Sequence, residues 1–291
     1  MSVRGVLFDV DGTVLRGDEP ISGAREGLEA VDAAGLSRLF VSNNPTEPPA
    51  AYRRRFEAAG FDVDPSEVLT AGAVTAEFLS MRHPDDRITV VGEPGLLSLL
   101  REEGLRAHRL TASPDSGPED EHQAQSDGGP TPGPHSTPPD VFVASVDREF
   151  SYPVLQRSLR ALSDPQVTFL GTDPDVVIPT ADGPAPGSGA IIDAIANVAG
   201  RDPDAILGKP SETAQEMALG RLGLSPEDVL VVGDRLDTDI ALGERAGMTT
   251  VLVRTGVTDE ADLDASPIDP DYVLDSLAGL ERLVDDVAVG R

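Results

Sequence analysis

The stretch "VRGVLFDVDGT", residues 3–13, decides the fold and locates the first candidate site. Its short apolar run, rich in valine and leucine, predicts a buried β-strand that ends directly in Asp9, Asp11 and Gly12. Alternate residues of an extended chain point the same way, so both carboxylates are expected to face one point beyond the strand. Adjacent carboxylates repel unless a proton or cation lies between them, and oxygen ligands on a tight turn suit Mg²⁺. The alternative is an ordinary turn, because Asp-Gly is common in turns.

Strands and helices alternate on both sides of the middle of the chain. Early in the sequence, "SRLFVSNN" (37–44) reads as a strand between two amphipathic helices, "GAREGLEAVDAAG" (23–35) and "AAYRRRFEAAG" (50–60). Late in the sequence the alternation recurs in "VLVVGD", "ALGERAG" and "TTVLVRTG". Strand–helix–strand order implies a parallel sheet with helices on both faces, which predicts a Rossmann-like, doubly wound α/β core.

The middle of the chain has its own strands and helices, enough for a second α/β domain inserted into the first. Its expected strands are "ITVVG", "VFVASV" and "VTFLGTD". We place the core in residues 1–76 and 185–291 and the insertion in residues 77–184. Within it, residues 110–139 are dominated by proline, glycine, serine and acidic residues, and cannot bury enough apolar surface to become ordered. We expect a disordered surface loop there, either a tolerated insertion or a segment that binds a partner.

Composition excludes several classes of function. The 291 residues include 51 acidic and only 23 basic ones, and the formal net charge is −28. A protein that binds a nucleic acid polymer would need the opposite charge. No cysteine is present, which excludes disulfides and thiolate metal sites. No apolar run is long enough to cross a membrane, and the start lacks a signal-peptide pattern, so we expect a cytoplasmic protein. An acidic surface with little lysine is typical of proteins from molar salt, where screening removes self-repulsion, and indicates a haloarchaeal source.

A second acidic turn follows another apolar strand, in "VLVVGDRLDTDI". It offers Asp234, Asp237 and Asp239 at a strand end, where they could complete a cation site with the first turn. The alternative is a helix N-terminus rich in aspartate, which capping and the helix dipole favour, and Asp237 fits that alternative best.

Polar groups that could bind phosphate follow two further segments. "FVSNN" places Ser42 and Asn43 at a strand end, although an ordinary Asn-rich turn would look the same. Lys209 is the only lysine in the chain and precedes Pro210 and Ser211, which look like a helix start. Helix N-termini attract anions, and a lysine there adds a compact positive charge. A lysine kept where every other long cationic side chain is arginine suggests a role that arginine cannot fill.

Together these motifs resemble those of the haloacid dehalogenase (HAD) superfamily of phosphohydrolases. The family's order is DxDGT, a Ser or Thr, a Lys and GDxxxxD, and here it is "DVDGT", "VSNN", "GKP" and "GDRLDTD". The segment "GTDPDVVIPTADGPAPGSGAI" followed by "GKPS" is similar to the NagD-like and 4-nitrophenylphosphatase-like subfamily IIA, which carries an inserted α/β cap of the C2 type. The likeness covers nearly the whole chain outside the acidic loop. Asp173 departs from it, because many relatives carry asparagine there.

The resemblance implies a role for each motif residue in the hydrolysis of a phosphomonoester. Asp9 would attack phosphorus to form an aspartyl-phosphate, and Asp11 would act as general acid and then general base. Ser42, Asn43 and Lys209 would bind the phosphoryl oxygens, with Lys209 also neutralising Asp9. The Mg²⁺ ligands would be Asp9, Asp234 and Asp11, the last through its backbone carbonyl, and Asp239 would orient the metal's shell.

Three functions follow from this reading. The first is a Mg²⁺-dependent phosphomonoesterase acting on a small phosphorylated metabolite such as a nucleotide monophosphate, phosphoglycolate or a sugar phosphate. The second is a phosphotransferase or phosphomutase that uses the same aspartyl-phosphate and excludes water. The third is a non-catalytic scaffold that binds Mg²⁺ or phosphate. The resemblance also suggests a homodimer formed through the cap, while the substrate-binding residues of the cap are not identified by the sequence.

Overall fold

The chain folds into two compact units, one inserted into the other. The computed structural model describes residues 3–112, 138–180 and 183–288. Unit 1 consists of Met1–Thr75 and Leu207–Arg291, and unit 2 of Ala76–Ile206. The acidic loop predicted over residues 110–139 lies, apart from its two ends, outside the described residues.

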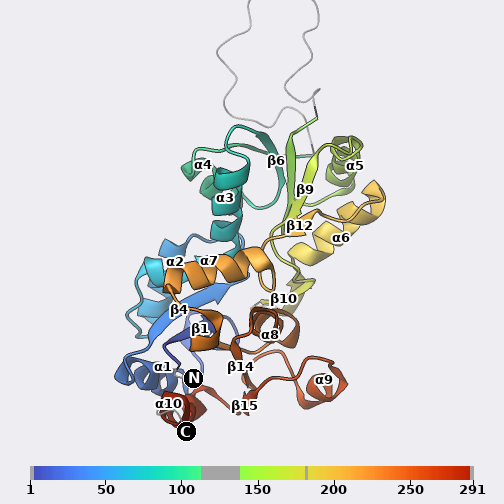
Figure 1. Cartoon of the computed structure of the whole chain (residues 1–291). Coiled ribbons are helices and arrows are strands. Elements are labelled where there is room, and N and C mark those ends of the chain that lie inside the picture. The colour runs from blue at the N-terminus through green and yellow to red at the C-terminus, as the bar shows by residue number, and fades with distance from the viewer. Residues whose placement is uncertain (1–2, 113–137, 181–182, 289–291) are drawn as a thin grey trace, which may run out of the picture. The chain divides into compact units, whose positions relative to one another are not determined.

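Unit 1 is built on a six-stranded parallel sheet (Figure 1). The strands lie in the order β15-β14-β13-β1-β4-β5. Their bounds are β1 (Gly5–Asp9), β4 (Ser37–Ser42), β5 (Val68–Thr70), β13 (Val229–Gly233), β14 (Thr249–Val253) and β15 (Tyr272–Leu274). β1 lies between β13 and β4, with Phe8 level with Val232 on one side and Phe40 on the other. A small hairpin, β2 (Leu15–Arg16) and β3 (Glu19–Pro20), follows β1. The predicted Rossmann-like α/β fold is confirmed.

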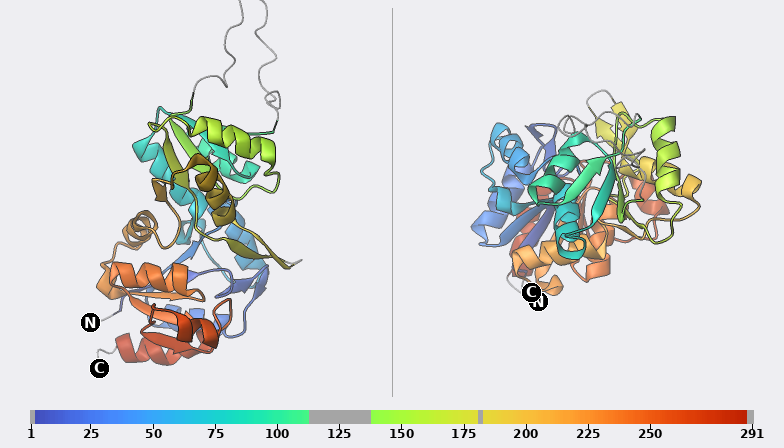
Figure 2. Two further views of the ribbon diagram at one scale, coloured as in Figure 1. Left: turned by 90° about the vertical axis from the view of Figure 1, so that its right-hand side faces the viewer. Right: turned by 90° about the horizontal axis from the view of Figure 1, so that it is seen from above.

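Helices cover both faces of this sheet (Figure 2). On one face, α1 (Ala24–Ala33), α2 (Pro49–Ala58) and α10 (Leu280–Ala288) contribute to a core that includes Phe8, Phe40 and Phe56. The other face carries α7 (Glu212–Leu222) and α8 (Ala241–Ala246), with the short α9 (Glu260–Ala265) nearby in sequence. Phe8 points into the first core, so Asp9, the next residue of the strand, points away from it.

Unit 2 has a five-stranded sheet in the order β12-β9-β8-β6-β7, also parallel, and a hairpin. Figure 1 shows α4 on one side of this sheet and α5 and α6 on the other. The strands are β6 (Arg87–Val91), β7 (Arg106–Arg109), β8 (Val141–Ala144), β9 (Thr168–Gly171) and β12 (Ala205–Ile206), and the hairpin is β10 (Val177–Thr180) with β11 (Gly183–Pro186). The helices are α4 (Pro94–Glu102), α5 (Tyr152–Ala161) and α6 (Ser188–Ala199), and α3 (Ala71–Arg82) runs across the first junction between the units.

The second junction differs from the boundary inferred from the sequence. The sequence placed the return to the core at residue 185, whereas the second unit continues to Ile206. The reason lies in α6, whose Ile191, Ile192 and Ile195 pack into the same apolar cluster as Phe142 and Phe169 of the five-stranded sheet. The sequence shows that α6 is amphipathic but not which sheet it covers.

Asp173, which follows β9 in unit 2, is a buried acid. It is 2% exposed, and its Oδ2 accepts a hydrogen bond of 2.9 Å from the Thr172 hydroxyl. Burial raises the pKa of Asp173 to about 7 from an ordinary 3.8, and the charge of Asp175 adds to this effect, while hydrogen bonds from Ser188 and Thr172 oppose it. The folded protein therefore holds a proton on Asp173 in a pH range where the unfolded chain does not.

The substitution Asp173→Asn should change how stability depends on pH. A raised pKa contributes stability fully below the unfolded pKa of 3.8, and this contribution is lost as the pH rises toward 7. The loss of stability is at most about 1.4 kcal/mol per pH unit. Asparagine does not titrate, so the variant does not have this pH-dependent loss. We expect urea unfolding between about pH 4 and pH 8 to show that the free energy of unfolding of the variant increases, relative to that of the wild type, as the pH rises. Asp193→Asn, at an exposed position of α6, is the control. A difference between wild type and Asp173→Asn that stays constant with pH would contradict this expectation.

Candidate active site

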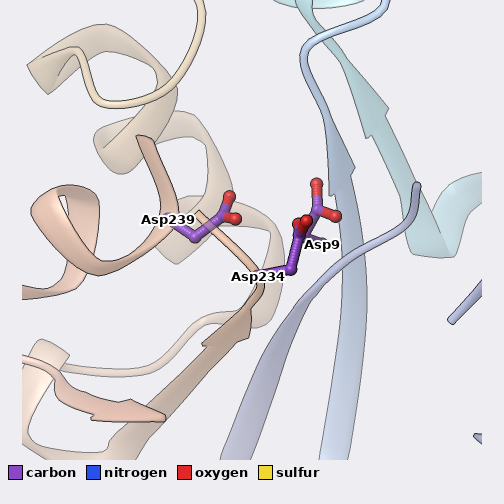
Figure 3. A group of neighbouring side chains, drawn as sticks. All are labelled: Asp9, Asp234 and Asp239. Carbon is purple, nitrogen blue, oxygen red and sulfur yellow. The ribbon is translucent and has the colours of Figure 1, made fainter. Parts of the chain in front are cut away.

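Two acidic turns meet at the carboxyl edge of the unit 1 sheet. Asp9 ends β1, and Asp234 follows β13, the neighbouring parallel strand. Asp239 lies one helical turn further along, in the segment Leu236–Ile240. Each of the three carboxylates has an oxygen within 4.8 Å of the other two. Figure 3 shows the three side chains turned toward one another from their separate backbone segments. The structure thus brings together three of the residues that the sequence singled out.

Asp234 is tightly enclosed by two glycine-containing turns. It is fully buried, and its Oδ2 accepts a hydrogen bond of 2.7 Å from the backbone N–H of Val257. A Cβ at Gly256 would lie 1.8 Å from this Oδ2, and one at Gly12 would lie 2.5 Å from it. Gly12 also has a φ of +99°, which side chains rarely allow. The glycine of the DxDGT motif is therefore required both by the turn and by the approach of Asp234.

Lys209 joins the acidic residues into one cluster. Its Nζ donates hydrogen bonds of 2.6 Å to Oδ1 of Asp9 and of Asp239. A third bond, of 2.9 Å, goes to the backbone carbonyl of Val41 at the end of β4. The three N–H groups of the ammonium are all used, and the lysine side chain is only 3% exposed. Such a site suits a compact ammonium and leaves no room for a planar guanidinium.

The backbone of Lys209 is fixed by Asn43. The Asn43 side chain accepts a hydrogen bond of 2.8 Å from the Lys209 N–H and donates one of 3.1 Å to its carbonyl. Directly after the lysine, Ser211 caps α7 by accepting a bond from the N–H of Ala214, as the predicted helix start requires. Asn43 was expected to bind phosphate, and the sequence did not indicate that its side chain also bonds the backbone of Lys209.

Ser42 is buried beside the cluster and bonded to a tyrosine. Its Oγ lies 2.9 Å from the hydroxyl of Tyr52, which is fully buried on α2. The Ser42 oxygen also accepts a bond of 3.2 Å from the N–H of Asn44. Its position is therefore set from two sides.

The charges of the cluster do not balance. Asp9, Asp234, Asp239 and Lys209 are three carboxylates and one ammonium, with a formal charge of −2. Burial raises the pKa of Asp9 well above its ordinary value, with Asp239 and Asp234 adding to the effect and Lys209 opposing it. Burial and Asp239 raise the pKa of Asp234 to about 6. For Lys209, burial alone would lower the pKa, but Asp239 and Asp9 outweigh it and raise it.

Two oxygens of the cluster are buried without a hydrogen bond among the described residues, Asp9 Oδ2 and Asp234 Oδ1. An unpaired carboxylate oxygen in a buried site is costly, so such atoms point to a group that is bound there. Hard carboxylate oxygens and an excess of negative charge are what Mg²⁺ requires. The donor set therefore fits the predicted cation.

Asp11 lies apart from this cluster. Its carboxylate is 41% exposed and lies 2.5 Å from Nη2 of Arg55 on α2. We expected the side chains of Asp9 and Asp11 to face one point, and in the structure Asp11 is paired with Arg55 and is not one of the three clustered carboxylates. β1 ends at Asp9, and the chain turns, with the N–H of Val14 bonded to the carbonyl of Val10. The alternation of an extended strand therefore stops before Asp11.

Two residues at the site escaped the sequence reasoning, Tyr52 and Arg55. Both lie in the stretch "AAYRRRFEAAG", where three arginines follow the tyrosine. Their spacing of three along a helix places them on one face, but this identifies Arg55 only once Tyr52 is known to lie at the site. Asp237 is 71% exposed and contacts Arg235, and it lies in the first turn of the segment Leu236–Ile240 without capping it.

Comparison with known families agrees with the motifs. A family model described as haloacid dehalogenase-like hydrolase matches residues 6–106, and one described as HAD-hydrolase-like matches residues 206–280. An acid sugar phosphatase of Staphylococcus aureus is 31% identical over 283 residues, which is 96% of this chain and 98% of the relative. The chain belongs to the haloacid dehalogenase-like hydrolases.

Solved structures of the same family superpose on nearly the whole chain. A p-nitrophenyl phosphatase from Archaeoglobus fulgidus has 32% identity and a TM-score of 0.81, over 97% of this chain and all of that one. NagD from Escherichia coli has 27% identity and a TM-score of 0.77, over 96% and 98%. A glycerol phosphate phosphatase from Mycobacterium tuberculosis, solved with magnesium, has 28% identity and a TM-score of 0.78, over 97% and 78%. These likenesses confirm the NagD-like subfamily and the predicted enzyme class, a phosphatase of the HAD type. Among the described residues, no helix is both long and apolar enough to cross a membrane.

The substitution Lys209→Arg tests how closely the site fits a lysine. A guanidinium in this filled position should force neighbouring groups apart and lower the free energy of unfolding by about 1–3 kcal/mol. Urea unfolding in a buffer of constant molar KCl would measure the change. Arg53→Lys, a swap at an exposed position of α2, should leave stability nearly unchanged. Equal stability of Lys209→Arg and wild type would mean that the site accepts either cation.

Proposed function

We propose that this protein is a Mg²⁺-dependent phosphomonoesterase that hydrolyses a small phosphorylated metabolite through an aspartyl-phosphate. The observation that carries this proposal is the state of Asp9. One of its oxygens is bonded to Lys209, and the other is buried without a partner among the described residues, beside the equally unpaired Asp234 Oδ1. A carboxylate held in this way is oriented for attack on phosphorus when a cation completes its surroundings.

In the first half of the reaction, an oxygen of Asp9 forms a bond to phosphorus while the bond from phosphorus to the ester oxygen breaks. Asp11 gives its proton to that departing oxygen, which leaves as an alcohol. In the second half, water attacks the aspartyl-phosphate, Asp11 takes a proton from the water, and the bond between phosphorus and Asp9 breaks. Inorganic phosphate and the starting enzyme result.

The remaining residues stabilise the phosphoryl group. The Ser42 hydroxyl and the backbone N–H of Asn43 are proposed donors to its oxygens. The Lys209 ammonium is the third, and it would exchange one of its bonds to Asp9 and Asp239 for a bond to a phosphoryl oxygen. Asp9, Asp234 and the backbone carbonyl of Asp11 would hold Mg²⁺, with Asp239 orienting its shell. The bound cation would supply the positive charge that lets a dianionic phosphate approach the carboxylates.

The names of the relatives favour one range of substrates. They are called acid sugar phosphatase, p-nitrophenyl phosphatase and glycerol phosphate phosphatase. Sugar and polyol phosphates are therefore the first substrates to test, followed by nucleotide monophosphates and phosphoglycolate. The residues that select the substrate are expected in the cap, and a homodimer formed through the cap remains part of the proposal.

Release of phosphate is the direct test of the proposed function. We expect hydrolysis of p-nitrophenyl phosphate and of some of these metabolites, in molar KCl, that requires Mg²⁺. Asp9→Asn should reduce kcat by at least about 10³-fold because it removes the nucleophile, whereas Asp237→Asn, an exposed change of the same kind, should retain activity. Transfer of the phosphoryl group to an acceptor sugar without free phosphate would favour a phosphotransferase. A folded protein that does neither would contradict the proposal.

Binding of the cation can be measured without turnover. A ligand that binds only the folded state raises its stability, so millimolar Mg²⁺ should raise the melting temperature of the wild type at constant ionic strength. Asp234→Asn should lose most of this increase, while Asp237→Asn, which changes the net charge equally, should keep it. An equal increase in all three proteins would indicate non-specific binding to the acidic surface.

A further inference from the structure

Arg55 forms a set of contacts at the edge of the site that the proposed mechanism does not use. Its Nη2 lies 2.5 Å from Oδ1 of Asp11 and 2.9 Å from the backbone carbonyl of Gly17. Asp18 and Glu47 also lie near the guanidinium, at 3.7 and 4.0 Å. Of the three carboxylates, Asp11 makes the shortest contact, and it is the one that ends the DxD motif.

The Arg55 guanidinium packs against the ring of Tyr52. Its central carbon lies 4.9 Å from the centre of the Tyr52 ring, and the Arg55 side chain is only 15% exposed. Tyr52, one helical turn earlier, is fully buried and bonded through its hydroxyl to Ser42. A cation stacked on a fixed ring has little freedom to move. Burial alone would lower the pKa of Arg55, but the hydrogen bond and charge of Asp11 raise it, so the guanidinium stays charged.

We propose that Arg55 is a positioning residue for Asp11, holding its carboxylate in the orientation needed for proton transfer. The inference rests on the proposed function, in which Asp11 is the general acid and base. The ion pair occupies Oδ1 and restricts the rotamer of the Asp11 side chain, which leaves Oδ2 to give and take the proton. Asp11 follows the turn after β1 and is 41% exposed, so without this contact its side chain would be free to rotate among several rotamers.

Through Tyr52 and Arg55, one face of α2 contacts two groups of the site. Tyr52 is bonded to Ser42, a proposed donor to the phosphoryl group, and Arg55 is paired with Asp11, the proposed donor to the leaving group. The two residues are three apart on the helix and stack on each other, so the phosphoryl side and the leaving-group side are held by one rigid element. Accurate placement of this kind is what proton transfer depends on.

The test uses two substrates that differ in their need for an acid. A nitrophenolate leaves readily without a proton, whereas an alkoxide such as that of a glycerol phosphate requires one. The parameter kcat/KM covers the reaction only as far as departure of the leaving group, so it isolates the acid step from the later attack of water. Arg55→Gln should lower kcat/KM about 10–100-fold for the alkyl ester and no more than about 3-fold for the nitrophenyl ester.

Three further variants make the result specific. Arg53→Gln, two residues away on the exposed side of α2 and paired with Glu57, should leave both substrates unaffected. Arg55→Lys keeps the charge but not the fork of donors, and should restore part of the activity on the alkyl ester. In an Asp11→Asn background, Arg55→Gln should have little additional effect, since a positioning residue acts only through the group that it positions. If Arg55→Gln does not fold, as judged by circular dichroism, Arg55→Lys takes its place in the comparison.

Other outcomes would overturn the inference. An equal loss on both esters would mean that Arg55 supports binding or folding and not the acid. An effect that persists in full with Asp11→Asn would mean that Arg55 acts independently of Asp11. Both results leave the proposed function intact, because they require an active wild type. A wild-type protein that hydrolyses neither ester would instead overturn the phosphatase proposal, and the role of Arg55 with it.

Discussion

The ion pairs of Lys209 with Asp9 and Asp239 are the interaction on which the rest of the site depends. They join residues 200 and 30 positions apart, at distances of 2.6 Å. Breaking a buried pair of this kind leaves an uncompensated charge, which costs several kcal/mol. The hydrogen bonds of Asn43 to the Lys209 backbone and the Ser211 cap of α7 fix the main chain around the lysine and so hold the ammonium in position.

The parallel sheet makes such a contact possible between distant parts of the chain. β1 lies between β13 and β4, so the segments that follow these three strands meet at one edge. The end of β1 contributes the Asp9 carboxylate, and the end of β4 contributes the Val41 carbonyl and the Ser42 hydroxyl. The segment after β13 contributes the carboxylates of Asp234 and Asp239. The inner residues of β1 and β13 are apolar and buried, and the polar residues of the site lie at or just beyond the carboxyl ends of the strands. An open α/β sheet commonly binds its ligand at this edge.

The residues that the sequence singled out and that the structure brings together are those whose place is set by a neighbouring element. Asp9 and Ser42 end apolar strands, Asp234 follows one, and Lys209 precedes a helix, so local pattern was enough to select them. The pairing of Asp11 with Arg55 could not be predicted, because the alternation of side chains holds only while the chain is extended. Arg55 was missed because nothing in "YRRRF" separates it from the arginines before it. Only the packing of α2 on the sheet decides which arginine reaches the site.

The length of the inserted unit was underestimated for a similar reason. The helix α6 belongs to the unit whose sheet it covers, and the sequence does not show which sheet that is.

The distribution of charge explains how an acidic protein can handle a phosphate. With a formal charge of −28, the surface repels a dianion, and dissolved salt screens such repulsion less at short range than at long range. The site itself must therefore supply positive charge. Two cations at the site are already paired with carboxylates, Lys209 with Asp9 and Asp239, and Arg55 with Asp11. The unpaired oxygens of Asp9 and Asp234 are what remains for a divalent cation. In the proposed mechanism the fixed cations orient the reactive carboxylates, and a bound divalent cation would supply the attraction for the substrate.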